Sequence, residues 1–196
     1  MRSMKKTYRV NEIFYSIQGE GYNAGLPAVF VRFSGCNLHC PFCDTQHETG
    51  VEMTAEQIRQ AVDEADGGRE TMVVLTGGEP TLQLTNDEDL FPAPCSRFVA
   101  IETNGTGEVP DWVDWVAVSP KQSIPIEQLP KFDEVKLLFD KTRLDYIQQF
   151  NRDELEAYIQ PIERNGECNF DEVVEFVKQN PRFRLSIQIH KLTGMK

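Results

Sequence analysis

Short apolar runs rich in β-branched and aromatic residues recur along the chain, and each run ends in polar or glycine-rich residues. Runs of this kind, bounded by turn residues, are typical of buried strands. The pattern therefore predicts strands within the segments 10–21, 27–36, 72–80, 97–105, 115–121, 133–140, 157–163 and 183–191.

Three segments between these runs carry a helical pattern instead. Residues 54–65 begin with Thr54 and Gln57 at the spacing of a capping box. The apolar residues of this segment recur every three or four positions and form one face: Ile58, Ala61, Val62 and Ala65. Residues 141–150 predict a second helix. A third, residues 169–179, begins at Asn169 with Glu172 three positions on, and directs three apolar residues inward: Val173, Phe176 and Val177.

Apolar strands that alternate with helices predict a mainly parallel sheet covered on one face. A complete eight-stranded barrel typically takes about 250 residues, and this chain has 196. We therefore expect an α/β fold, an incomplete TIM-type barrel of about six mainly parallel strands with reduced helices, formed by residues 1–196 as a single domain. In such folds the chemistry lies at the carboxyl ends of the strands, where this sequence has its polar motifs.

The overall composition is that of a folded protein, with 40% hydrophobic and 10% aromatic residues. The formal net charge of −11 argues against a nucleic-acid partner, because binding to nucleic acid requires a basic face. The first ten residues, MRSMKKTYRV, lack the apolar stretch of a signal peptide. No later run reaches the roughly 20 apolar residues of a membrane helix. We expect a cytoplasmic protein with no membrane partner.

Three of the five cysteines, Cys36, Cys40 and Cys43, lie within eight residues of one another. Such a cluster is typical of metal ligation or redox chemistry rather than of a disulfide framework. A structural zinc site needs a fourth protein ligand, which His39 or His47 is close enough in sequence to supply. A [4Fe–4S] cluster on three thiolates instead leaves one iron open to a molecule with an amine and a carboxylate, as in S-adenosylmethionine. The spacing leaves both kinds of site open.

The cysteine spacing C-x-x-x-C-x-x-C, with Phe42 directly before the last cysteine, resembles the signature of the radical S-adenosylmethionine enzymes. TGGEP, at residues 76–80, resembles the second motif of that superfamily, in which Gly-Gly-Glu at a strand end meets the methionine end of the cofactor. Glycine allows a close backbone approach to a ligand, and Glu79 can accept from an ammonium group. The implied cofactors are S-adenosylmethionine and a [4Fe–4S] cluster held by Cys36, Cys40 and Cys43.

Further segments, in order along the chain, resemble the 7-carboxy-7-deazaguanine synthase family: YSIQGEG, VRFSGCNL, CDT, IETNGT, SPK, QPIE and QIHK. The resemblance covers most of residues 11–191. It implies conversion of 6-carboxy-5,6,7,8-tetrahydropterin to 7-carboxy-7-deazaguanine with loss of ammonia, in queuosine biosynthesis. It also implies that S-adenosylmethionine is cleaved by the reduced cluster and that the 5′-deoxyadenosyl radical abstracts a hydrogen from the pterin, whose ring then contracts.

The resemblance implies where the ligands bind. The pterin is expected to contact Ile17, Gln18, Gly19, Arg32, Thr76 and Lys196, with Glu20 and Glu102 as further contacts. Arg32 suits the pterin carboxylate, because a guanidinium pairs with a carboxylate through two parallel hydrogen bonds. S-adenosylmethionine is expected to contact Phe42, Cys43, Asp44, Gly78, Ser119, Pro120, Lys121, Gln160, Pro161, Ile162 and Glu163.

Further expectations concern single residues. The resemblance implies that the hydroxyl of Thr45 binds Mg²⁺, which prefers oxygen ligands and commonly keeps several waters. It also implies that the terminal carboxylate of Lys196 reaches the substrate. From their residue type alone, Cys95 and Cys168 are interpreted as small buried hydrophobes outside the site, and His190 as a structural residue at a strand end.

Two alternatives to this enzyme stay open. A glycyl-radical activating enzyme carries the same cysteine spacing, but it requires a docking surface for a large protein, and SIQGEG before the cysteines favours a small-molecule substrate. The other alternative is a non-catalytic binding module stabilised by zinc. The implied enzyme further needs a reductase such as flavodoxin or ferredoxin, and a homodimer is the expected assembly.

Overall fold

A nine-stranded sheet forms the centre of the fold in the computed structural model, which describes residues 6–43, 45–87, 90–92, 97–164 and 166–196. From one edge to the other, its strands are β11 (Arg184–Leu185), β8 (Glu156–Gln160), β7 (Glu134–Leu138), β6 (Trp115–Val118), β5 (Val99–Thr103), β4 (Met72–Gly77), β2 (Pro27–Phe33), β1 (Thr7–Ile17) and β3 (Val51–Thr54). The pairings from β2 to β11 are parallel, whereas β1 is antiparallel to β2 and β3 is antiparallel to β1.

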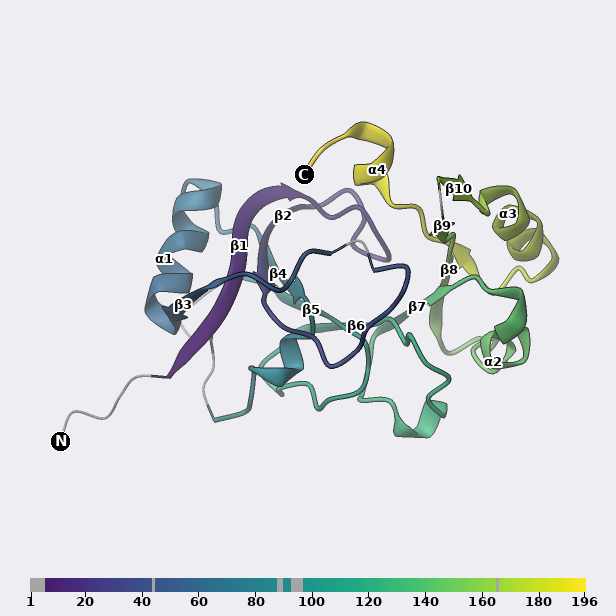
Figure 1. Cartoon of the computed structure of the whole chain (residues 1–196), viewed down its shortest axis with the longest axis horizontal. Helices are drawn as coiled ribbons and strands as arrows, with labels where there is room; N and C mark the ends of the chain where they lie inside the picture. Colours follow the sequence, from purple (N-terminus) through teal and green to yellow (C-terminus); the bar gives the residue numbers. More distant parts are fainter. Residues whose placement is uncertain (1–5, 44, 88–89, 93–96, 165) are drawn as a thin grey trace.

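The helices beside this sheet are short. α1 (Ala55–Asp66) and α3 (Phe170–Gln179) are the longest, and α2 (Leu144–Gln148) and α4 (Ile189–Thr193) have five residues each. Figure 1 shows α1 beside β1 and β3 at one end of the sheet and α2 and α3 near β8 at the other end. The remaining elements are the hairpin of β9 (Glu163–Arg164) and β10 (Glu167–Cys168) and the 3₁₀ turns η1 (Pro80–Leu82), η2 (Ile126–Gln128) and η3 (Lys141–Arg143).

The predicted fold class is confirmed, because the sheet is mainly parallel and carries few helices. The parallel strands β2 and β4 to β8 make up the six that were expected, and β11 extends them by two residues. The antiparallel β1 comes from the predicted segment 10–21. The sequence pattern does not predict β3, since its residues are exposed or half-buried and show no apolar run.

Segment 183–191 departs from its prediction. Only Arg184–Leu185 pair with β8, and the chain then enters α4. The Ile189 N–H donates to the carbonyl of Gly19 at 3.2 Å, which directs this segment to the loop after β1 instead of along β8. His190 therefore lies in a helix, and its predicted place at a strand end is wrong.

Both longer helices begin where the sequence predicts, but only α1 has a side-chain cap. In α1, Thr54 accepts from the Gln57 N–H at 3.3 Å and the Gln57 side chain accepts from the Thr54 N–H at 2.8 Å, which is a capping box. Asn169 makes no such bond to α3. Its side chain accepts from the Ile162 N–H at 2.7 Å and donates to the Phe139 carbonyl at 2.9 Å, so it fixes the segment after β8 instead.

The two faces of the sheet differ in character because successive residues of a strand point to opposite sides. One face is apolar and packs against the helices, with Val29, Val73 and Ile101 among its buried residues. The other face has an apolar floor that includes Phe30, Val74 and Ala100. Two positions further along the same strands stand Arg32, Thr76 and Glu102. The polar residues thus lie at the carboxyl ends of the strands, as predicted.

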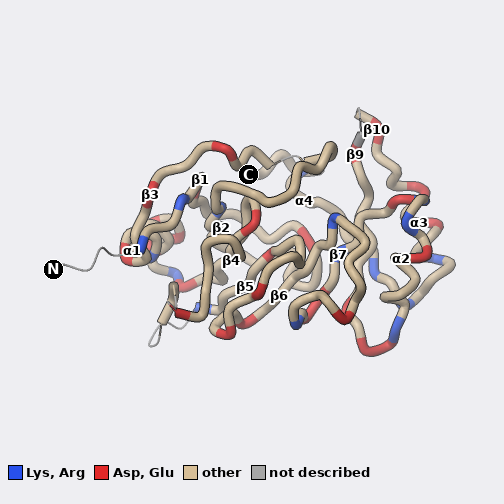
Figure 2. Tube along the Cα trace, turned by 60° about the horizontal axis from the view of Figure 1, so that its bottom comes forward, with Lys and Arg blue, Asp and Glu red and all other residues tan. Residues whose placement is uncertain are grey.

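Acidic and basic residues are interspersed along the trace in Figure 2, so the surplus of negative charge is spread over the fold. None of the helices in the described part of the chain has the length and apolar character needed to span a bilayer.

Candidate active site

The three cysteines lie on one long loop, residues 34–50, between β2 and β3. Asn37, next to the first cysteine, accepts from the Asn104 side chain at 3.0 Å and donates to the Thr106 hydroxyl at 2.8 Å. Both partners belong to the IETNGT segment at the end of β5. In Figure 1 the loop crosses in front of β5 and β6. These contacts hold the cysteines over the carboxyl ends of the parallel strands.

The Gly-Gly-Glu segment after β4 supports the same loop. Gly77 has φ of +121°, and a Cβ built on it would lie 2.3 Å from the Phe33 carbonyl oxygen. A Cβ on Gly78 would lie 1.8 Å from the Gly35 carbonyl oxygen. Glu79 is fully buried and accepts hydrogen bonds from the N–H and hydroxyl of Thr81, the hydroxyl of Thr103 and the N–H of Asn104. Glu79 therefore braces loops, whereas the sequence predicts a carboxylate that receives an ammonium group.

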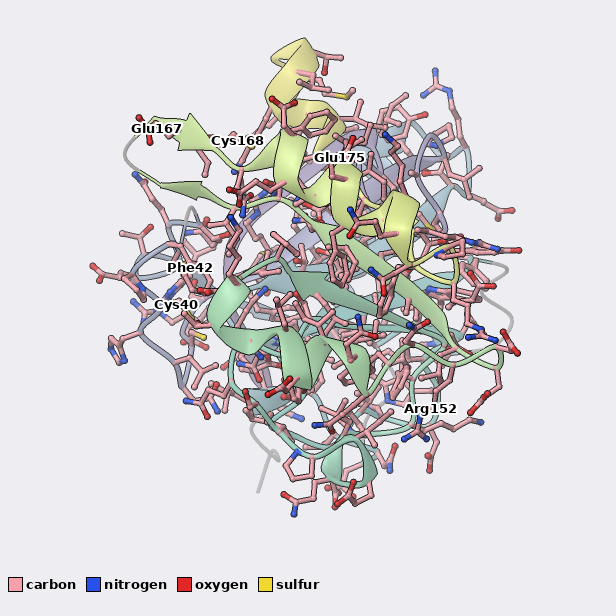
Figure 3. The ribbon with its side chains drawn as sticks, turned by 90° about the vertical axis from the view of Figure 1, so that its right-hand side faces the viewer. Cys40, Phe42, Arg152, Glu167, Cys168 and Glu175 are labelled. Atoms are coloured by element: carbon pink, nitrogen blue, oxygen red, sulfur yellow. The ribbon has the colours of Figure 1, made fainter. Side chains whose placement is uncertain are left out.

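A first cavity, of about 210 Å³, opens between the cysteine loop and the strand ends. Leu38 and Leu138 give it apolar walls. Figure 3 shows Cys40 and Phe42 below the hairpin that carries Glu167, and Glu163 of that hairpin lines the cavity. Of the residues predicted to bind the cluster or S-adenosylmethionine, those in its lining are Cys36, Cys40, Cys43, Phe42, Gly78, Ser119, Lys121, Gln160, Pro161, Ile162 and Glu163.

The three thiols fit an iron–sulfur cluster better than a single metal ion. Among the described residues, no three His, Cys, Asp or Glu side chains converge closely enough to hold one ion. Ligands of a cluster stand farther apart, because each thiolate binds a different iron. The Leu38 N–H donates to the Cys36 sulfur at 3.4 Å, and hydrogen bonds to sulfur are a feature of protein-bound clusters.

The thiols also affect one another electrostatically. Burial raises the pKa of the Cys40 thiol; the charge of Lys121 partly offsets this increase, and the neighbouring Cys43 and Cys36 raise the pKa again. Thiolates that repel one another in this way are stabilised by bound iron, which supplies positive charge.

A second cavity, of about 310 Å³, adjoins the first. Phe14 and Phe30, stacked with ring centroids 5.1 Å apart, form its apolar side. Its lining includes every residue predicted to contact the pterin: Ile17, Gln18, Gly19, Arg32, Thr76 and Lys196. The two cavities have six lining residues in common, so they adjoin along a shared wall, and we refer to the two together as the chamber: Glu20, Thr45, Thr76, Glu102, Gln188 and Lys191.

A buried lysine lines the first cavity and pairs with two carboxylates that line both. Lys136, on β7, donates to Glu20 at 2.8 Å and to Glu102 at 2.9 Å, and its side chain is only 5% exposed. Burial alone raises the pKa of Glu20, but the charge and the hydrogen bond of Lys136 lower it to about 2. The boundary therefore holds an ion pair that persists at neutral pH. Further donors to the two carboxylates are Gln188, Gln18 and Thr76.

Arg32 and Lys196 share one carboxylate at the other side of the second cavity. Glu12 lies 3.1 Å from Arg32 and 2.6 Å from the Lys196 ammonium group. Both cations also lie over the ring of Phe14, at 5.2 and 4.9 Å from its centroid. Because the Arg32 and Glu12 side chains are 31% and 26% exposed, an incoming anion can reach this cluster.

The sequences and structures of known proteins agree with this geometry. The profile of the Radical SAM superfamily matches residues 30–121, which include the three cysteines and TGGEP. A 7-carboxy-7-deazaguanine synthase of Bacteroides thetaiotaomicron is 42% identical over 96% of this chain and 98% of that protein. One from Caulobacter vibrioides is 38% identical over 96% of this chain and 99% of its own length. The chain belongs to the 7-carboxy-7-deazaguanine synthase family.

A solved structure agrees with this assignment. The crystal structure of QueE from Escherichia coli resembles the fold with a TM-score of 0.73 and 27% sequence identity, over 93% of this chain and 94% of that one. The similarity therefore extends over nearly the whole fold.

The remaining residues singled out from the sequence have different outcomes. Pro120 is buried and is not part of either lining. Asp44 and Cys95 lie outside the described residues. Cys168 is exposed on β10, so its interpretation as a buried hydrophobe is wrong. His190 lines the second cavity from α4. The binding roles of the cavity residues in this 7-carboxy-7-deazaguanine synthase family member stay predictions.

Sequence reasoning missed the residues that connect the two cavities, above all Lys136. A signal was present, because EVKLL places Glu134 and Lys136 two positions apart in an apolar strand and hence on one face. Charged residues are seldom fully buried unless they are paired, so this spacing indicates partners across the sheet. Gln188 and Lys191 were missed because the predicted strand at 183–191 conceals the turn into α4.

Proposed function

We propose that this chain converts 6-carboxy-5,6,7,8-tetrahydropterin to 7-carboxy-7-deazaguanine with loss of ammonia, a radical lyase reaction of 7-deazapurine and queuosine biosynthesis. The observation that carries the proposal is the joining of the two cavities into one chamber, with three cysteines in the first and Arg32 in the second. In such a chamber a cofactor bound at the thiols would stand against a pterin bound at Arg32, which supports the proposed reaction. The family names of the relatives support the same reaction.

The family uses a [4Fe–4S] cluster and S-adenosylmethionine. When bound, the cluster supplies the electron that cleaves S-adenosylmethionine and starts the radical reaction. Three thiolates leave room for the amino and carboxylate groups of that molecule. Gly78 stands beside its methionine end in this proposal. Its ribose and adenine contact Ser119, Pro120, Lys121, Gln160, Pro161, Ile162 and Glu163, with Phe42, Cys43 and Asp44 on the adenine side.

The second cavity offers what a carboxylated pterin needs. The amino and ring N–H groups of a pterin are donors, and Gln18, Glu20 and Glu102 are acceptors close to one another. The main-chain groups of Ile17 and Gly19 add further partners. The pterin carboxylate suits Arg32, because a guanidinium binds a carboxylate through charge-assisted hydrogen bonds. Enclosure of the pterin between these groups orients it and keeps water from the radical.

Thr45 is the proposed Mg²⁺ ligand. It is one of the residues shared by both cavities, which is where a metal touching the substrate carboxylate would stand. One hydroxyl is sufficient as a protein ligand if water and the substrate complete the coordination, as is common for Mg²⁺. Lys196, whose main-chain oxygen accepts from Ser16 at 2.7 Å, is the further proposed substrate contact.

The wider setting is also proposed. A single domain carries the reaction, since one continuous sheet supplies both cavities. A reductase such as flavodoxin or ferredoxin supplies electrons in the cytoplasm, where the pterin is made available, and two copies of the chain form a homodimer.

Anaerobic reconstitution with iron and sulfide, followed by reductant, S-adenosylmethionine and the carboxylated tetrahydropterin, tests the proposal. The expected product has the mass of 7-carboxy-7-deazaguanine, and ammonia is released in equal amount. Replacement of Cys36, Cys40 and Cys43 by alanine is the control and should abolish both iron binding and product. Fully clustered protein that forms no product overturns the proposal. A glycyl-radical activating enzyme would need a protein substrate, and a zinc module would bind zinc and form no product.

A further inference from the structure

Lys136 is the most enclosed charge in the chamber. It lies on β7, between Glu20 from the loop after β1 and Glu102 from β5. The side chains are 5%, 15% and 23% exposed, so little water competes for these ion pairs. A cation that bridges two carboxylates in such surroundings fixes the position of both and offsets their negative charge.

The two carboxylates keep acceptor capacity for a ligand. An ionised carboxylate has about four lone-pair sites. Glu102 accepts from Gln18 at 3.2 Å, from Thr76 at 2.9 Å and from Lys136 at 2.9 Å. Glu20 accepts from Lys136 and Gln188, both at 2.8 Å. Among the described side chains, the donors thus fill fewer sites than the two carboxylates offer, and both residues line both cavities.

We propose that Lys136 is a positioning residue that holds Glu20 and Glu102 as a fixed pair of ionised acceptors for the 2-amino and ring N–H groups of a pterin, an inference that rests on the proposed function. The 2-amino-4-oxo ring of a pterin carries these donors side by side. A ring with a second carbonyl in place of the 2-amino group directs an acceptor at the carboxylates instead. The two carboxylates repel the oxygen of that carbonyl. Lys136 therefore determines the selectivity between the two rings as well as the affinity for the pterin.

The charged groups around Lys136 indicate how its removal will act. Burial alone lowers the pKa of Lys136, but Glu102, Glu20 and Glu134 raise it above its usual value. Lys121, from the segment after β6, and His190, from α4, are the other charged or titratable neighbours of this cluster. With Lys136 absent, burial becomes the dominant influence on Glu20 and raises its pKa. Protonation of Glu20 then removes an acceptor as the pH falls.

Equilibrium binding of 6-carboxypterin and of 6-carboxylumazine, its analogue with a 2-oxo group, tests the proposal on reconstituted protein. Wild type should prefer the pterin, and Glu20 should add no pH dependence between pH 7 and pH 5.5, where the ring N–H of the ligand stays protonated, because the pKa of Glu20 is about 2. In Lys136→Met, affinity for the pterin should fall about 10- to 100-fold, and it should fall further toward low pH. The preference for the pterin over the lumazine should shrink by a similar factor.

Controls separate positioning from folding. Lys136→Arg keeps the cation and should keep the preference and most of the affinity. Lys178→Met removes an exposed lysine that pairs only with its helical neighbour Glu175 among the described residues, and should bind like wild type. If Lys136→Met alone does not fold, the double variant Lys136→Met, Glu20→Gln removes the ion pair of Lys136 with Glu20 as a unit. The preference for the pterin should still be reduced, because Glu102 then lacks the cation that fixes its position. Iron content and circular dichroism identify folded protein.

The outcomes are distinct. If Lys136→Met loses affinity for both ligands equally, or loses no affinity, the proposed role of Lys136 is overturned. Equal affinity of wild type for the two ligands overturns it as well, even where the wild type forms product. Product formation is measured in a separate assay. Absence of product from the wild type would therefore contradict the proposed function and not the role of Lys136.

Discussion

Gly78 packs directly on the backbone of Gly35: a Cβ built on Gly78 would lie 1.8 Å from the Gly35 carbonyl oxygen. The same oxygen accepts from the Glu79 N–H at 2.8 Å. Gly35 is the residue before the first cysteine, so the end of β4 fixes the start of the cysteine loop. The small size of Gly78 is therefore required by contact between two backbone segments, before any ligand approaches it.

Gly78→Ala should prevent this contact. The collision is with backbone, which cannot rotate away, so we expect a loss of roughly 3 kcal/mol in the free energy of unfolding and iron binding reduced severalfold after reconstitution. Gly68→Ala is the control, because Gly68 has open space around it, so its replacement adds only the backbone strain of a positive φ, of +72°, and no collision. It should cost about 1 kcal/mol and leave iron binding intact. Full iron content in Gly78→Ala would contradict this account of the loop.

Glu79→Gln tests whether this carboxylate braces loops. An amide presents N–H groups to the donors of Thr81, Thr103 and Asn104, so we expect a loss of about 1–3 kcal/mol in the free energy of unfolding, measured by chemical denaturation. The exposed Glu127 is the matched position, and Glu127→Gln should change stability little. An unchanged denaturation midpoint in Glu79→Gln, together with weaker binding of S-adenosylmethionine, would instead assign Glu79 to the cofactor.

Glu12 pairs with Arg32, which is expected to receive the substrate carboxylate. Arg32→Ala should weaken binding of 6-carboxypterin at least about tenfold, because a charge-assisted pair is lost. Glu12→Gln should strengthen binding, since Arg32 and Lys196 are then released from an internal carboxylate. Pterin without the carboxylate is the control ligand, and its affinity should respond to neither change. If Arg32→Ala lowers the affinity for both ligands equally, Arg32 does not bind the carboxylate.

Thr45 is expected to contribute its oxygen to Mg²⁺. Product formation by the wild type should rise when Mg²⁺ is added, and Thr45→Ala should blunt that rise. Thr45→Ser should keep most of it, because the hydroxyl is the ligand and the methyl group is incidental. The three proteins are compared at equal iron content. Equal responses to Mg²⁺ in all three would remove Thr45 from the metal site.

Local sequence signals were sufficient for β1, β2 and β4 to β8 and for the first helix. The capping box of Thr54 and Gln57 depends only on residues three positions apart, and the apolar runs of β2 and β4 are bounded by glycines. The close spacing of the three cysteines likewise predicts that they share one loop. Where the deciding contacts are local, the pattern of the sequence and the structure agree.

Long-range contacts account for what was missed. Lys136 is separated by 116 positions from Glu20 and by 34 from Glu102, and only the curvature of the sheet brings them together. The turn into α4 depends on the bond of Ile189 to Gly19, which no local pattern records. Taken alone, Glu79 resembles a ligand group. Two of its four hydrogen bonds come from the neighbouring Thr81, and the other two, from Thr103 and Asn104, form only because β4 and β5 lie side by side.

The central claim is that the two cavities form one reaction chamber, in which a radical made in the first acts on a pterin in the second. The most direct measurement uses 6-carboxytetrahydropterin deuterated at both ring carbons that carry hydrogen, incubated with the reduced, reconstituted protein. The account predicts deuterium in the adenosyl group of the recovered 5′-deoxyadenosine or S-adenosylmethionine. Formation of 5′-deoxyadenosine that carries no deuterium, at a pterin concentration that saturates binding, would contradict it.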